Sequence, residues 1–134
     1  MKLYQSDYLQ IDAFDEQKLL ELTWLPATAN MTSEEYKNEH VELLKFMLDK
    51  KVERILGNIK ELGFVANPKV QEWMNINIFV PAMEVGFSKL AVVMSTEFFA
   101  QLAIEQVMEE EVAQQIMTKY FDDVEEPREW IVNI

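Results

Sequence analysis

The stretch from Glu34 to Phe87 constrains the fold most, because it alternates helix-like and strand-like patterns. An amphipathic helical pattern precedes Val52–Ile59, a segment with the apolar character of a buried strand, and a second helical pattern follows it. A strand between two helices predicts a central parallel strand in an α/β sheet. Gly57 within it is small enough for close backbone approach. The whole 34–87 stretch contains no serine or threonine.

Capping residues place the start of both helices. Thr32 with Glu35 three residues later forms a capping-box pattern, so the first helix should begin there. Asn67 followed by Pro68 is a favoured cap and first-turn pair for the second helix. Pro81 should break or kink that second helix, because proline lacks the backbone N–H that the helix needs.

The N-terminal segment predicts an antiparallel hairpin. Tyr8–Ile11 and Leu19–Trp24 have strand-like apolar patterns, and the polar segment 12–17 can turn the chain between them.

The C-terminal part predicts two further strands and two helices. Leu90–Met94 is a short apolar run typical of a buried strand, and Gln115–Phe121 alternates as a last strand. Between them, Ser95 or Thr96 should cap a helix, and Asp122 with Glu125 resembles a second capping box before a short final helix. The expected apolar face of the helix after Ser95 is Phe99, Leu102, Ala103 and Val107.

These elements follow one another as β-β-α-β-α-β-α-β-α. The order predicts a single α/β domain over residues 1–134, with a mixed β-sheet, an N-terminal antiparallel hairpin and packed helices.

The composition argues against several classes of partner. A formal net charge of −12 disfavours nucleic acids and anionic membrane surfaces, which bind lysine- and arginine-rich proteins. No apolar run is long enough to insert across a bilayer, and the chain has no cysteine for disulfides or thiolate chemistry. We therefore expect a cytoplasmic protein. The acidic surface after Glu97 either serves solubility or docks a basic partner.

Several groups of residues along nearly the whole chain carry a resemblance to a known family. They are Trp24, the helix entry 31–36, the strand 52–58, Gln71–Glu72–Trp73, Pro81, Gly86 and the closing segment 121–130. In this order they resemble the STAS-like family of small bacterial proteins grouped with anti-sigma-factor antagonists. Sec14-type lipid-binding domains share the broader architecture. The resemblance implies a STAS-like fold and a regulatory, protein-binding role.

Two positions and one segment depart from what the resemblance implies. Related sequences often carry aspartate at the position of Asn58 and alanine at that of Pro127. An anti-sigma antagonist also presents a serine or threonine after the central strand, where phosphorylation alters partner docking through added charge. The segment from Asn58 to Pro68 has no hydroxyl side chain. We therefore expect no phosphorylation switch in this segment.

The sequence offers no recognisable catalytic, metal or cofactor site. His40 is the only histidine and lies on the apolar face of the first helix, so we expect a buried structural role or a ligand contact. Its acidic neighbours Glu39 and Glu42 do not share its helix face, as a metal site would require. The three glycines are isolated, which excludes a glycine-rich phosphate loop. We predict a non-enzymatic protein without cofactors.

Two candidate binding regions follow. The leading prediction is a protein-interaction module that binds a partner or a second copy of itself through Phe98, Phe99 and Leu102. The alternative is a binder or carrier of a small apolar ligand or lipid, as in Sec14-type domains. Its candidate pocket residues are Asn58, Lys60, Phe64, Trp73 and Phe79.

Overall fold

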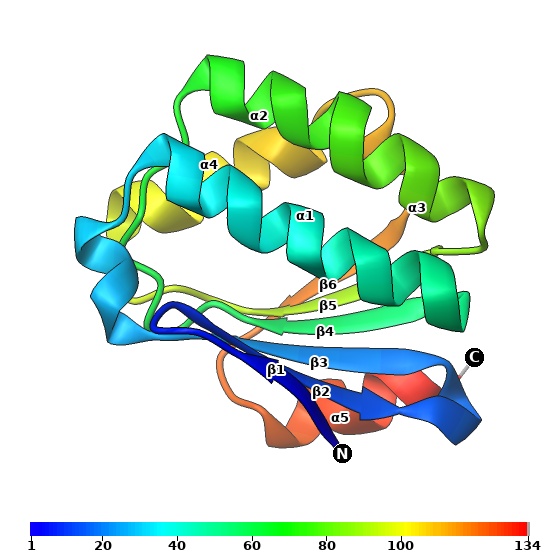
Figure 1. The fold of residues 1–134 in the computed structure, drawn as a ribbon. Helices are drawn as coiled ribbons and strands as arrows, with labels where there is room; N and C mark the ends of the chain where they lie inside the picture. Colours follow the sequence, from blue (N-terminus) through cyan, green and yellow to red (C-terminus); the bar gives the residue numbers. More distant parts are fainter. Residues whose placement is uncertain (134) are drawn as a thin grey trace.

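A six-stranded mixed sheet organises the chain, with its strands in sequential order β1-β2-β3-β4-β5-β6 (Figure 1). The structure is a computed structural model and describes residues 1–133. The strands are β1 (Lys2–Gln5), β2 (Leu9–Phe14), β3 (Leu19–Trp24), β4 (Arg54–Asn58), β5 (Lys89–Val93) and β6 (Met117–Phe121). The helices are α1 (Ser33–Lys50), α2 (Pro68–Met74), α3 (Val80–Glu84), α4 (Phe98–Met108) and α5 (Glu125–Val132), with short 3₁₀ turns at Asp15–Gln17, Pro26–Asn30 and Ala113–Gln115.

The chain direction explains why most helices lie on one face of the sheet. β1, β2 and β3 pair antiparallel, whereas β3 to β6 pair parallel. Each parallel connection moves one strand further in the same direction, and such crossovers are right-handed. The crossover helices α1, α2–α3 and α4 therefore cover the same face, and α5 returns to cover the other (Figure 1). The predicted α/β class, mixed sheet and N-terminal antiparallel pairing are confirmed.

The sheet separates two apolar cores. The larger one lies under α1 to α4 and includes Ile55 and Val92, whereas the smaller one, under α5, includes Leu56, Val93 and Ile131. Successive residues of a strand point to opposite faces, so Ile55 and Leu56 enter different cores.

The N-terminal prediction was incomplete. The structure adds an edge strand, β1, and extends β2 through Asp12 to Phe14, so the chain turns at residues 15–18 instead of 12–17. Alternation explains the longer strand: Leu9, Ile11 and Ala13 are buried while the residues between them face outward. Asp12 lies on the less buried face of β2, so its charge does not end the strand.

The predicted caps of the first two long helices are confirmed, and those of the last two were wrong. Thr32 and Glu35 form the reciprocal capping box, and the Asn67 side chain accepts a hydrogen bond from the N–H of Val70. α4, however, is capped by Glu97, whose carboxylate accepts from the N–H of Ala100 at 2.7 Å. α5 starts after Val124, which has no capping side chain, and it is the neighbouring Asp123, instead of Asp122, whose carboxylate accepts a hydrogen bond of 3.3 Å from the N–H of Glu126.

Pro81 lies where the second helical segment changes geometry. The chain continues from α2 through the π-helical segment Asn75–Phe79 into α3, without leaving the helix. Proline has no backbone N–H to donate to the carbonyl one turn earlier. A wider π turn just before the proline accommodates the loss of this helical hydrogen bond. Gly86 ends the segment with φ 115°, a conformation suited to glycine.

Candidate functional site

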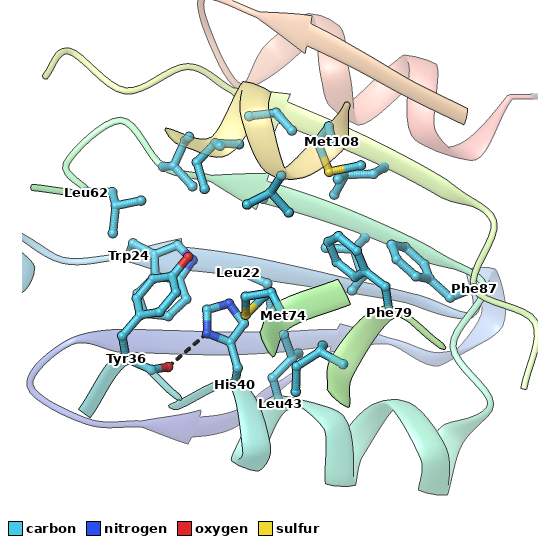
Figure 2. Close-up of a pocket in the computed structure, with 18 of the residues that line it drawn as sticks. Leu22, Trp24, Tyr36, His40, Leu43, Leu62, Met74, Phe79, Phe87 and Met108 are labelled. Carbon is cyan, nitrogen blue, oxygen red and sulfur yellow. Dashed lines mark hydrogen bonds between the residues drawn. The ribbon is translucent and has the colours of Figure 1, made fainter. Parts of the chain in front are cut away.

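A cavity of about 90 Å³ lies between the sheet and the helices of the larger core (Figure 2). Its floor comes from β3, β4 and β5, and its walls come from α1, the α2–α3 segment and α4. The lining residues are Leu22, Trp24, Tyr36, His40, Leu43, Met47, Ile55, Gly57, Ile59, Leu62, Met74, Ile78, Phe79, Phe87, Leu90, Val92, Ile104, Val107 and Met108. Nearly all are apolar, so the cavity favours apolar contents.

Three aromatic rings form one end of the cavity. The ring centres of Tyr36 and His40, one helical turn apart on α1, are 4.5 Å apart, and the centre of Trp24 on β3 lies 5.1 Å from that of His40. Figure 2 shows Trp24, Tyr36 and His40 clustered beside Met74. These rings carry N–H or O–H groups in an otherwise apolar lining, so they supply the polarity of the site.

His40 is held in one tautomer by its own helix. Its Nδ1 lies 2.9 Å from the backbone carbonyl oxygen of Tyr36, so Nδ1 carries the hydrogen and donates it to that oxygen (Figure 2). The side chain is 6% exposed, and burial lowers the pKa of His40 to about 4. The ring is therefore neutral at pH 7. Its Nε2 carries a free lone pair and has no hydrogen-bond partner among residues 1–133.

The structure distributes the predicted pocket residues over different places. Phe79 lines the cavity. Phe64 does not line the cavity but packs against Tyr36, with the two ring centres 4.4 Å apart. Trp73 lies under the Lys37 ammonium at 5.5 Å, outside the cavity lining.

The two polar candidates also lie outside the cavity. The Asn58 side chain accepts a hydrogen bond from the N–H of Lys60, and this bond shapes the loop after β4. Lys60 itself is exposed, and its carbonyl oxygen accepts from Thr96. These residues lie at the carboxyl edge of the sheet and do not line the cavity, although Gly57 and Ile59 on either side of Asn58 do.

Phe98, Phe99 and Leu102 lie together on α4 and are exposed by 68%, 61% and 38%. The two phenylalanine rings meet edge to face, with centres 5.2 Å apart. The expectation that Phe99 and Leu102 lie on the buried face of this helix was wrong. The buried residues of α4 are Ala100, Ala103, Val107 and Met108, and the helix packs mainly against α2.

Sequence reasoning missed most of the cavity. It recognised His40 as buried but did not connect it with Trp24 and Gly57, which come from different strands. Only the parallel pairing of β3 and β4 brings these positions to one face. The sequence nevertheless held one indication of the cavity: Gly57 is an isolated glycine inside a strand pattern, where a larger side chain is usual.

Compared with protein families, with curated proteins and with solved structures, the chain matches none. Over residues 1–133, no three His, Cys, Asp or Glu side chains are grouped so that they could hold a metal ion. No helix in that same range is both long and apolar enough to cross a bilayer.

Proposed function

We propose that this chain is a non-enzymatic, cytoplasmic protein-interaction module of the STAS-like type, and that it binds its partner through Phe98, Phe99 and Leu102. The observation that carries the proposal is the exposure of two adjacent phenylalanines on one helix. Large aromatic side chains are favoured anchors of protein interfaces, and they are unfavourable on a surface that stays in water. Because the core contact of α4 uses alanines, these phenylalanines are not needed to hold the helix in place.

Charge around this patch indicates the chemistry of the partner. From residue 97 to residue 118 the chain has five glutamates and no lysine or arginine. Glu97 caps the helix that carries the patch, and Glu105 lies on that helix. A partner with an apolar surface bordered by lysine or arginine complements this arrangement, whereas two copies meeting here would bring like charges together. We therefore favour a different protein as partner over self-association.

The loop after β4 bears on whether phosphorylation could regulate binding of the partner. Residues 59–67 connect β4 to α2 and contain no serine or threonine. We therefore propose that phosphorylation of a hydroxyl side chain on this loop does not control docking.

A lipid carrier of the Sec14 type has less support. Ligand pockets for drug-sized molecules usually enclose roughly 300–1,000 Å³. The cavity of this chain is about 90 Å³, which is too small for an acyl chain.

Site-specific photo-crosslinking tests the interaction. A photoreactive phenylalanine analogue at position 98, in the native cell, should capture one protein, and the same analogue at Val41 should not. Val41 is a suitable control because it is an exposed apolar residue on α1. With the purified partner, Phe98→Glu should weaken binding by about tenfold or more, while Val41→Glu should have little effect.

Two results would count against the proposal. Equal capture from positions 98 and 41 would mean that α4 is not the docking surface. A concentration-dependent dimer in light scattering that Phe98→Glu dissociates would show instead that the partner is a second copy of the chain.

A further inference from the structure

Gly57 lies in the cavity floor, and its backbone conformation does not require glycine. It is paired with Leu22 and Val92 in the middle of the sheet, and all three line the cavity. Gly86, by contrast, has a positive φ, a backbone conformation that favours glycine. A Cβ atom at Gly57 would lie 3.8 Å from the Ala91 carbonyl oxygen and 4.0 Å from Leu90 Cδ1, which are ordinary contacts. Alanine would therefore fit, and glycine weakens a strand.

The missing side chain thus leaves space that the fold does not require. Cores are normally packed as densely as organic crystals, and voids larger than a water molecule are few. The sheet keeps this void at its central strand, in a cavity that His40 and Met74 also line.

The π-helical segment shapes the opposite wall. Met74, Ile78 and Phe79 all line the cavity. In an α-helix Ile78 and Phe79 would point about 100° apart. The i to i+5 spacing of a π turn aligns Phe79 with Met74, so both can face the sheet. Such π segments occur frequently at functional sites.

The polar group that points to a ligand is Nε2 of His40. Because Nδ1–H is committed to the Tyr36 carbonyl, Nε2 can only accept a hydrogen bond. A water molecule, which needs two to four polar partners, could bind only at the end formed by Trp24, Tyr36 and His40, because the rest of the lining is apolar. A ligand with an apolar body and one donor group matches this lining better.

We propose that this cavity is a binding site for a compact, neutral molecule that has an apolar body and one O–H or N–H group, which donates to Nε2 of His40. The volume limits its size. Since an apolar cavity of about 150 Å³ binds benzene, which has six non-hydrogen atoms, a cavity of about 90 Å³ holds roughly three or four. The site shares no residue with the Phe98–Phe99–Leu102 patch, although α4 contributes side chains to both.

The methyl groups of methionine allow a direct test by NMR. Met47, Met74 and Met108 line the cavity, whereas Met1 and Met117 are exposed by 70% and 63% and serve as internal controls. We would titrate the full chain, labelled with ¹³C in its methionine methyl groups, with 2-propanol and with acetone. Both probes have four non-hydrogen atoms, but only 2-propanol has an O–H to donate.

The expected result is saturable shifts at the three cavity methyls and none at Met1 and Met117. 2-Propanol should bind about three- to tenfold more tightly than acetone, the range that one hydrogen bond provides. Gly57→Ala, which keeps normal contacts, should weaken 2-propanol binding several-fold, and Gly57→Val should abolish it. Phe98→Glu should bind like the wild type.

Three outcomes would overturn the proposal. Unsaturable shifts, or shifts as large at Met1 and Met117, would mean that no specific site exists. Equal affinity for 2-propanol and acetone would mean that the ligand does not donate a hydrogen bond to Nε2 of His40. Unchanged binding by a folded Gly57→Ala variant, with the fold checked by the remaining methionine signals, would place the site elsewhere.

Discussion

The ammonium of Lys89 on β5 donates a hydrogen bond of 2.6 Å to the backbone carbonyl oxygen of Trp130 on α5, and it lies 4.3 Å from the centre of the Trp130 ring. The same ammonium also donates to the carbonyl oxygen of Asn133. A cation therefore binds the negative end of α5 and fixes this helix against the sheet. Burial, with a smaller effect from Arg54, lowers the pKa of Lys89.

Lys89→Met should loosen α5. The methionine keeps the apolar contacts of the stem but loses the bonds to the carbonyls, so we expect the free energy of unfolding to fall by about 2 kcal/mol. Lys119→Met is the matched control, since Lys119 is exposed and lies 5.2 Å from the Phe121 ring; its cost should stay below about 1 kcal/mol. Urea unfolding measures both. Equal effects would mean that the Lys89 contacts do not stabilise the fold.

His40 should make the stability fall on the acidic side of neutrality. The pKa of about 4 in the folded protein lies below the ordinary value of 6.5, so below pH 6.5 the unfolded chain binds a proton that the folded chain does not. The stability from this group is complete above pH 6.5 and is lost between pH 6.5 and 4, by roughly 3 kcal/mol in total.

Comparison with His40→Phe isolates this contribution from the carboxylates. The advantage of the wild type over the variant should shrink by that amount between pH 7 and pH 4, measured by urea unfolding at several pH values. Parallel pH profiles of the two proteins would contradict the prediction.

Glu97→Ala should destabilise α4. The carboxylate of Glu97 accepts from the N–H of Ala100 at 2.7 Å, and loss of an N-cap costs about 1 kcal/mol. Glu105→Ala removes an exposed glutamate from the same helix and should change the stability by less than about 0.5 kcal/mol. Thermal unfolding followed by circular dichroism compares the two. A larger loss in Thr96→Ala than in Glu97→Ala would mean that the cap is assigned to the wrong residue.

Leu56 should be among the most sensitive positions of the smaller core. It is fully buried, and Leu56→Ala should lower the free energy of unfolding by about 2–5 kcal/mol. Leu56→Asp and Val92→Asp would bury an unpaired charge and should give insoluble or molten protein. Leu48, which is 40% exposed on α1, is the control, and Leu48→Ala should cost less than about 1 kcal/mol. A folded Leu56→Asp with the melting behaviour of the wild type would contradict the two-core arrangement.

Local rules predicted the parts of the fold that depend on neighbouring residues. The capping box at Thr32 and the Asn67–Pro68 helix start depend on a few consecutive residues, and the structure has both. The central strands were also predictable, because continuous apolar runs between helices have few alternatives. β1 was missed, since an edge strand such as Lys2–Gln5 is only half-buried and has little apolar pattern.

The parts that were missed depend on contacts between distant segments. Phe99 has a period that suits a buried helix face, but α4 buries Ala100 and Ala103 instead and packs mainly against α2, a segment distant in the sequence. The cavity combines residues from three strands and three helical segments, so only Phe79 among the predicted pocket residues lines it. The sequence pattern of one element cannot show which element will face it.

The sequential strand order has a consequence for how the chain is made. Each strand joins the edge left by the one before it, so no strand has to be inserted between two that are already paired. During synthesis, when N-terminal parts form first, the sheet can grow from β1 outward. The face that carries Leu56 nevertheless stays open until residues 125–132 have emerged from the ribosome. We therefore expect the nascent chain to be most prone to aggregation just before its last helix is complete.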